Sequence, residues 1–284
     1  MKQQGTITIG KFEPGCINED AVLSRPGLIA VSDGAGGGGL FAERWSRYLL
    51  AHLPDTPIGS AEALDGWLES IWEPFYNQCE QDAQQLGGLS LDKFYDEGSF
   101  ATLVAVWRTA VNRCQWMSFG DSVAFHYNKR THQLEHSFSR LADFDNPPYL
   151  INCKDELRKE GFRCGTFETD ADSILFVASD ALAHYLLMMY EVEHLDLFAA
   201  EWEEAMARHS KNENYMRAAL SIPKHLFETK VLSKLLNSTG APINFQRHLR
   251  SLLRRGLIAH DDYSVAYMRL ANHPFPAPKG KKSR

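Results

Sequence analysis

The chain has 284 residues, 44% of them hydrophobic, so it is long enough to bury a full core in one large domain or two modest ones. Its 36 acidic and 30 basic residues give a formal net charge of -6. This balance lacks the basic surplus that binding to a phosphate backbone requires, which argues against nucleic acid as a main partner.

Cysteine content and apolar runs indicate the compartment. The five cysteines are odd in number and contain no CxxC pair, which favours reduced thiols over a zinc site: Cys16, Cys79, Cys114, Cys153 and Cys164. The start, "MKQQGTITIGKF", has no apolar core of the kind that signal peptides carry. No apolar run approaches the roughly 20 residues of a membrane helix. We therefore expect a cytoplasmic protein with no membrane partner.

The first half of the chain predicts strands, then helices, then strands. Alternation at period two predicts a meander over residues 6–12, 21–24 and 27–33. Apolar residues at three-to-four spacing predict a buried helix from Phe41, and Ser60 is expected to cap a longer helix that Pro74 kinks or restarts. Beyond Gly87 and Gly88, four segments resemble a second antiparallel meander: 99–107, 113–120, 122–128 and 132–138.

The second half is mainly helical. Residues 139–170 look irregular, and residues 173–180 form a buried strand. Residues 263–270 close the fold as a strand. Amphipathic spacing predicts helices between these strands, at 182–190, 195–209, 224–237 and 243–255.

The glycine run "VSDGAGGGG" at 31–39 raises the possibility of nucleotide binding. Gly34, Gly36 and Gly39 fit G-x-G-x-x-G after a strand and before a helix. A dinucleotide-binding unit, however, needs a parallel strand directly after that helix, and a second helix follows here. Asp33 would also repel a pyrophosphate. Dinucleotide binding is therefore a distant alternative.

Acidic residues follow or precede several predicted strands: Glu19 with Asp20, Asp33, Asp180, and Asp261 with Asp262. Strand ends can bring distant side chains into one open pocket. Carboxylates and backbone carbonyls are the ligands that suit magnesium or manganese. For any one acid alone, capping of a turn or helix is the simpler explanation. As a set they favour a hard-cation site, with glycines that let the Gly34 carbonyl face an ion.

Six short segments, taken in order, resemble the metal-dependent protein phosphatase family, the type 2C serine/threonine phosphatases. They are similar to that family's N-E-D, V-x-D-G-x-G-G, G-S/T-T-A, N-x-G-D-S-R, L-L-x-x-S-D-G and D-N-x-T-V motifs. In this chain they read "INEDAVL", "IAVSDGAGG", "GSFATLVAV", "SFGDSVAF", "ILFVASDAL" and "DDYSVAYM". The segments run from residue 17 to residue 268, so the resemblance covers nearly the whole chain.

The resemblance implies an α+β fold, a four-layer α-β-β-α sandwich with two mostly antiparallel sheets flanked by helices. It also implies two divalent cations, Mn or Mg, held directly or through water by Glu19, Asp33, Asp180, Asp261 and the Gly34 carbonyl. Asp33, Asp180 and Asp261 are the implied catalytic residues. Two such ions, on the order of 3.5–4 Å apart, can activate a bridging water for in-line attack on a phosphate ester.

Some positions depart from the family's pattern. Members usually carry a phosphate-binding arginine four residues before the glutamate, and that position is Gly15 here, a loss worth about 1.5–3 kcal/mol of phosphate binding. Lys11 and Arg25 are candidates to replace it. Some members bind a third ion through the G-D-S aspartate, Asp121 here, together with an aspartate at a position that is His184 here. Histidine can still ligate manganese.

Two further departures lie beside the implied metal ligands. The glycine of S-D-G is Ala181, which is strained by about 1 kcal/mol if that position has positive φ and harmless otherwise. Asp262 stands where the family has asparagine, which adds negative charge.

We expect one phosphatase-like domain over residues 1–272, with a helical insert at about 185–257 and a disordered basic tail at 273–284. The leading hypothesis is a Mg/Mn-dependent phosphatase that acts on phosphoserine or phosphothreonine in proteins, so its partner is a phosphoprotein. The rival is a non-catalytic pseudophosphatase that serves as a regulatory or binding module. The sequence makes no prediction of oligomeric state.

Overall fold

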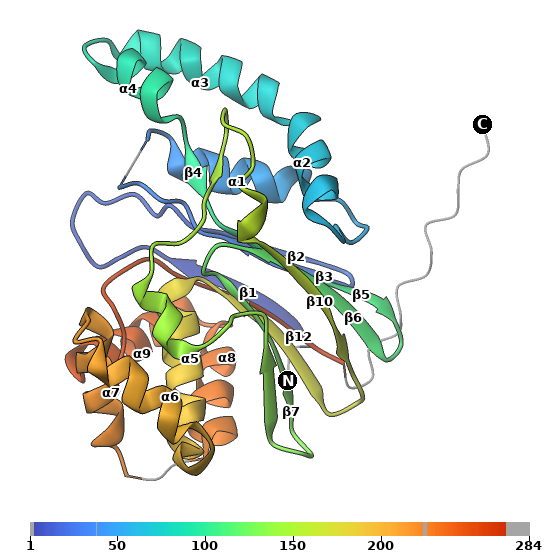
Figure 1. Cartoon of the computed structure of the whole chain (residues 1–284), viewed down its shortest axis with the longest axis vertical. Helices are drawn as coiled ribbons and strands as arrows, with labels where there is room; N and C mark the ends of the chain where they lie inside the picture. Colours follow the sequence, from blue (N-terminus) through green and yellow to red (C-terminus); the bar gives the residue numbers. More distant parts are fainter. Residues whose placement is uncertain (1–2, 38, 224–225, 271–284) are drawn as a thin grey trace.

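Two five-stranded sheets form the centre of this computed structural model, which describes residues 3–37, 39–223 and 226–270. The sheets pack face to face, and helices cover the outer face of each (Figure 1). All strand pairs in both sheets are antiparallel. The four-layer α-β-β-α sandwich expected from the sequence is therefore confirmed.

The strand order of the two sheets brings distant parts of the chain together. The first sheet runs in the order β1 (Gln4–Ile9), β12 (Tyr263–Arg269), β11 (Ser173–Ala178), β7 (Val123–Asn128) and β8 (Gln133–His136). The second sheet runs in the order β10 (Phe162–Glu168), β6 (Arg113–Phe119), β5 (Leu103–Ala110), β3 (Leu28–Ser32) and β2 (Ala21–Arg25). A short pair, β4 (Phe100–Ala101) with β9 (Ile151–Asn152), lies apart from both sheets.

One helical layer belongs to each sheet. Over the second sheet lie α1 (Ala42–His52), α2 (Ala61–Glu69), α3 (Trp72–Leu86) and α4 (Ser90–Glu97). Over the first sheet lies the α5–α9 layer, which consists of α5 (Asp180–Glu193), α6 (Leu195–Ala207), α7 (Lys211–Leu220), the π-helix η3 (Phe227–Leu232), α8 (Ser233–Ser238) and α9 (Pro242–Arg254). The two short 3-10 turns are η1 (Leu141–Asp145) and η2 (Lys159–Gly161).

The core is divided among the layers. Apolar side chains from both sheets meet in the space between them, among them Ile29, Val31, Val104, Val106, Leu175, Val177 and Met268. The strands that supply them are buried on both faces, which explains their nearly continuous apolar sequences. The α5 helix is buried over most of its length because it lies between the first sheet and the other helices of its layer.

The two predicted meanders are wrong in one respect. The strands form where the alternation predicts them, but β1 lies in the first sheet while β2 and β3 lie in the second. Similarly, β5 and β6 pair in the second sheet, and β7 and β8 pair in the first. The chain therefore crosses between the sheets at residues 10–20 and at residues 120–122, and it crosses again before and after β10, at residues 137–161 and 169–172.

Besides the short elements β9, η1 and η2, three longer elements were not predicted from the sequence. The segment 90–97 is helix α4, whose Phe94 is fully buried, and the segment 211–220 is helix α7. The segment 162–168, expected to be irregular, is the edge strand β10. Of the two outcomes expected at Pro74, the restart is confirmed and the kink is not, because α2 ends at Glu69 and a new helix, α3, begins at Trp72 with Pro74 in its first turn.

Among the described helices, none has the length and apolar character needed to cross a bilayer. The five cysteines are all free thiols. The predicted tail at 273–284 lies outside the described residues, as do residues 224–225 of one predicted helix.

Candidate functional site

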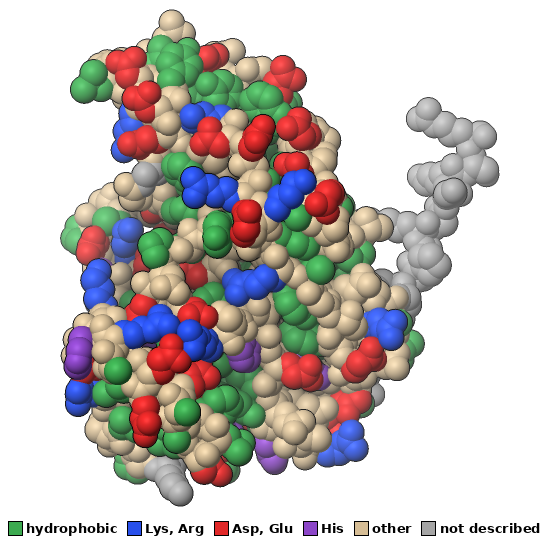
Figure 2. Space-filling view, viewed as in Figure 1, with side chains coloured by type: hydrophobic (Ala, Val, Ile, Leu, Met, Phe, Trp, Pro, Cys, Tyr) green, Lys and Arg blue, Asp and Glu red, His purple; other side chains and the backbone are tan. Residues whose placement is uncertain are grey.

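One end of the sandwich collects the acidic residues that the sequence singles out. Asp33 follows β3, Asp180 follows β11, and Asp261 precedes β12. Glu19 and Asp20 end the first crossing between the sheets, and Asp121 lies in the second. Strand register places these positions at the same end. In the second sheet Ala21 is paired with Ser32, Val31 with Val104, and Leu103 with Phe119. In the first sheet Ala178 is paired with both Val123 and Val265. Figure 2 shows this face hollowed between the two helical layers, with acidic atoms inside the hollow.

Asp33 and Asp180 lie at the centre of the acidic cluster. Thr102 fixes the backbone of Asp33 on both sides, by its own N–H to the Asp33 carbonyl at 2.8 Å and by its hydroxyl, which accepts the Asp33 N–H at 3.2 Å. Asp180 is the first residue of α5, where the helix dipole favours a negative charge. Burial and the surrounding carboxylates nevertheless hold the pKa of each group well above its usual range.

Glu19 is held in place by Asp262 and by Gly36. Oδ2 of Asp262 accepts the Glu19 backbone N–H at 2.7 Å. The Glu19 carboxylate is hydrogen-bonded by the Gly36 backbone, and a Cβ atom at position 36 would overlap that carboxylate. The glycine run therefore allows the Asp33 loop and the Glu19 loop to approach each other closely.

Asp20 is a member of the cluster that the sequence-based assignment of ligands left out. It is 2% exposed and lies beside Asp33, Ser179 and Ser264. Within the described residues neither of its carboxylate oxygens accepts a well-formed hydrogen bond. Burial raises its pKa to about 7. A buried carboxyl group without a partner is costly, so its position favours a ligand that brings positive charge.

Asp121 lies at the border of the cluster. Burial raises its pKa to about 6, with the charge of Asp261 acting in the same direction and that of Arg163 against it. Asp121 also raises the pKa of Asp33 and Asp180, which places its charge close to both.

The structure places the two candidate phosphate-binding cations differently. Lys11 lies at the site, with Nζ 3.9 Å from the Glu19 carboxylate and its backbone N–H bonded to Asp262. Partial burial lowers the pKa of Lys11, but the charges of Asp262 and Glu19 outweigh it and raise that pKa overall. Arg25 instead caps the end of α1, donating to the Leu50, Ala51 and Leu53 carbonyls.

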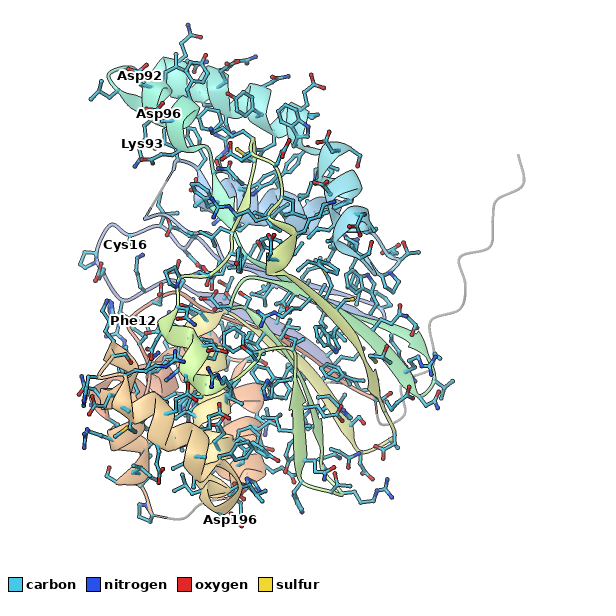
Figure 3. All side chains as sticks on the ribbon, viewed as in Figure 1. Phe12, Cys16, Asp92, Lys93, Asp96 and Asp196 are labelled. Atoms are coloured by element: carbon cyan, nitrogen blue, oxygen red, sulfur yellow. The ribbon has the colours of Figure 1, made fainter. Side chains whose placement is uncertain are left out.

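Gly15 and Ala181, the two departures from the family's pattern, have clear local structures. Gly15 has a φ of +82° in an open part of the first crossing, which is a conformation that an arginine there would rarely adopt. Ala181 lies in α5 and has no positive φ, so it causes no strain. Phe12 and Cys16, labelled in Figure 3, mark the course of this crossing beside both helical layers.

His184, the candidate partner of Asp121 at a third ion, lies one turn into α5. Its ring packs edge-on against Phe144 and Tyr215 inside the α5–α9 layer. Burial lowers its pKa to about 4, so it is neutral, and in the described part of the chain its Nε2 atom has no hydrogen-bond partner.

The chemistry of this donor set suits a hard cation. The groups are oxygen donors, which are the ligands that hard cations prefer. Burial and mutual repulsion raise the pKa values of Asp20, Asp33 and Asp180, so a cation bound among them would relieve the repulsion. No group of three or more His, Cys, Asp or Glu residues is already drawn together as a metal site in residues 3–37, 39–223 and 226–270. Individual ligand assignments therefore remain predictions.

Comparison with solved structures identifies the architecture. The catalytic domain of the serine threonine protein phosphatase PstP, in complex with two manganese ions, is similar with a TM-score of 0.51 and 18% identity, covering 93% of this chain and 96% of that chain. The Mycobacterium tuberculosis serine/threonine phosphatase PstP/Ppp gives a TM-score of 0.50 at 18% identity, with 93% and 97% covered. A bacterial serine phosphatase gives 0.50 at 14% identity, with 94% and 97% covered.

The chain has the fold of the type 2C serine/threonine phosphatases. The resemblance found in the sequence is thus confirmed at the level of fold. No protein-family model and no curated protein matches the sequence, in keeping with a divergent chain. The dinucleotide alternative loses its structural basis, because β3 is antiparallel to both of its neighbours, β2 and β5.

Proposed function

We propose that this chain hydrolyses phosphoserine and phosphothreonine in proteins with the help of two divalent cations, Mn or Mg. The observation that carries the proposal is the acidic cluster at one end of the sandwich, where buried carboxyl groups at Asp20, Asp33 and Asp180 have raised pKa values. The fold supports it, and so does the PstP structure in complex with two manganese ions.

The proposed ligands are Asp33, Asp180, Asp261, Glu19 and the Gly34 carbonyl. Two divalent cations held there would lower the pKa of a bound water and stabilise the charge that develops on the attacking and leaving oxygens. The residues of the chain supply the rest. Asp262 and Gly36 orient the Glu19 loop, and Thr102 orients Asp33.

Asp20 has the position to accept a proton. It lies directly beside Asp33, and within the described residues neither of its oxygens accepts a well-formed hydrogen bond, so its ionised carboxylate can accept a proton from a water held at the cluster. A third cation at Asp121 is a weaker proposal, because His184 is packed between aromatic rings.

The proposed substrate is a phosphorylated protein. Five free cysteines are compatible with a reducing compartment such as the cytoplasm. We further propose that residues 1–272 form one phosphatase domain, in which the helical insert at 185–257 is a packing layer or a surface for substrates and regulators.

The test is hydrolysis of para-nitrophenyl phosphate and of a phosphothreonine peptide with Mn, Mg or EDTA. Asp33→Asn and Asp180→Asn remove proposed ligands, and Asp172→Asn, on a surface turn, is the matched control. We expect metal-dependent turnover in the wild type and the control, and loss of at least 100-fold in both ligand variants. Folded wild-type protein that binds manganese and releases no phosphate from either substrate would instead indicate the pseudophosphatase.

A further inference from the structure

A pocket of about 260 Å³ adjoins the acidic cluster on the side of the second crossing. Its wall includes Asp121 of the cluster, Arg163 of β10, and Phe138 and Tyr149 from the segment that joins β8 to β10. Of the cluster carboxylates, Asp121 faces this pocket directly. A molecule bound here would therefore lie next to the proposed reaction centre.

Arg163 is held rigidly in the pocket wall. Its Nη2 donates to the Gly120 carbonyl at 2.5 Å, and its guanidinium lies 4.9 Å from the centre of the Phe138 ring. An arginine carries five N–H donors. Among the described residues the bond to Gly120 is the one hydrogen bond of this guanidinium, so most of its donors remain unshared.

Arg163 and Asp121 face the same pocket without touching. No direct ion pair joins these two described residues, although each charge shifts the pKa of the other. Burial lowers the pKa of Arg163, and the Asp121 carboxylate opposes that shift. A cation and a carboxylate are thus kept apart across a space that a third group can enter.

The other cations near this end are already bound to acids. Arg140 and Arg208 both contact Asp143 and Glu204 at the edge of the α5–α9 layer. Lys11 pairs with Glu19 through its ammonium group and with Asp262 through its backbone N–H, and it does not line this pocket. Among these groups Arg163 combines a fixed position, unshared donors and a pocket wide enough for a ligand.

We propose that Arg163 binds the phosphoryl group of the substrate and so supplies the bidentate contact that Gly15 does not provide. Phosphate oxygens and a guanidinium fork match in geometry, which a lysine cannot reproduce. The pocket wall around Phe138 and Tyr149 then receives the peptide on one side of the phosphorylated residue. This inference rests on the proposed function, but it concerns binding and can be tested separately from turnover.

The experiment compares wild type, Arg163→Met and Arg163→Lys. Methionine keeps an apolar stem that can pack on Phe138 and removes the charge. The matched control is Arg44→Met, since Arg44 lies 4.8 Å over the Phe41 ring and pairs with Asp82, away from this pocket. Circular dichroism and melting temperature establish that each variant is folded.

The first measurement is equilibrium binding by calorimetry in magnesium. The probes are a peptide with a non-hydrolysable phosphonate analogue of phosphothreonine and the same peptide with threonine. We expect Arg163→Met to lose about 10- to 100-fold of the preference for the phosphonate peptide, Arg163→Lys to lose less, and Arg44→Met to stay within twofold of wild type. The second measurement is the KM for the phosphothreonine peptide, which should rise in the same order.

The outcomes separate the two proposals. Active wild-type enzyme whose phosphonate preference is unchanged in folded Arg163→Met would overturn the assignment of Arg163 and leave the phosphatase proposal intact. A wild type without turnover, whose phosphonate preference depends on Arg163, would support Arg163 and overturn the phosphatase proposal. If wild type neither turns over nor prefers the phosphonate peptide, both are wrong.

Discussion

Oδ2 of Asp262 accepts the backbone N–H of Glu19 at 2.7 Å, across 243 positions of sequence. Oδ1 of the same carboxylate accepts the N–H of Lys11, also at 2.7 Å. Asp262 is 4% exposed, so both bonds are shielded from water. The extra negative charge that the sequence places beside the proposed ligands therefore has a structural role: it joins both ends of the first crossing to the start of β12.

Asp262→Asn should destabilise the fold. Asparagine keeps one acceptor oxygen and turns an NH2 group toward an N–H donor, which leaves a buried donor unpaired at a cost of about 1–3 kcal/mol. Urea unfolding followed by circular dichroism measures this loss. Asp172→Asn is the control, because this side chain is 45% exposed in a turn and has only long ion pairs, at 3.9 Å to Lys129 and 3.8 Å to Arg130. It should change the unfolding free energy by less than about 0.5 kcal/mol. Equal urea midpoints for Asp262→Asn and wild type would show that the two hydrogen bonds accepted by Asp262 do not stabilise the fold.

Gly36→Ala should weaken metal binding. The new Cβ would overlap the Glu19 carboxylate and displace it from the cluster. Gly37→Ala is a neighbouring control, because a Cβ there meets nothing within 4 Å. We expect calorimetric titration with manganese to give at least about a tenfold loss of affinity for Gly36→Ala and less than a twofold change for Gly37→Ala. Equal losses in both variants would show that the loop, and not the contact with Glu19, determines affinity.

Manganese affinity should rise with pH between about 5.5 and 7.5. Burial raises the pKa of Asp20 to about 7 and that of Asp121 to about 6, so the metal-free cluster carries protons in this range. A cation binds the ionised form, so binding must release those protons and is favoured as pH rises. Calorimetry at pH 6.5 in buffers of different ionisation enthalpy counts the released protons. A count of zero would contradict the raised pKa values.

Glu191 should make the protein less stable as pH rises. Burial raises its pKa from 4.5 to about 8, with the charge of Glu201 adding to the shift and the Trp202 Nε1–H, which donates at 2.8 Å, opposing it. Between those two values the unfolded chain ionises this group while the folded protein keeps it protonated. Folding stability is therefore lost progressively from about pH 4.5 to pH 8, by about 1.4 kcal/mol per unit at most.

Glu191→Gln should remove this pH dependence, because the amide stays neutral and keeps an acceptor for Trp202. We expect the variant to gain on the order of a few kcal/mol relative to wild type at pH 8 and little at pH 4.5. Unfolding in urea at several pH values, followed by tryptophan fluorescence, measures the difference. The exposed Glu156→Gln is the control. If the difference in unfolding free energy between wild type and Glu191→Gln does not change from pH 4.5 to pH 8, Glu191 is ionised in the folded protein and this prediction is wrong.

Local sequence pattern predicted the strands well and their partners poorly. Alternation in residues 6–12 and 21–24 indicates the strands that form as β1 and β2, but nothing local indicates that they belong to different sheets. That division depends on which apolar faces meet across the sandwich. Edge strand β10 was missed because only Phe167 is buried along it, and α4 because one buried residue, Phe94, anchors its eight residues.

The candidate site was predicted in outline. The position of acids at strand ends led to Asp33, Asp180 and Asp261, which the fold brings to one end. Asp20 belongs to the N-E-D segment, but the resemblance gave the ligand role to its neighbour Glu19, and the burial of Asp20 beside Asp33 depends on tertiary packing. Arg163 carried no sequence signal, because it lies in an edge strand far from any motif and reaches the cluster through the pairing of β10 with β6.

The pairing of β1 with β12 has a consequence for how the protein is made. These strands come from opposite ends of the described chain, and Gln4 lies opposite Met268. A ribosome adds residues in order, so β1 has no β12 to pair with until residues 263–269 have been made, and until then the acidic cluster lacks Asp261 and the two bonds of Asp262. The growing chain is therefore expected to gain its metal-binding capacity only after β12 has been translated and has paired.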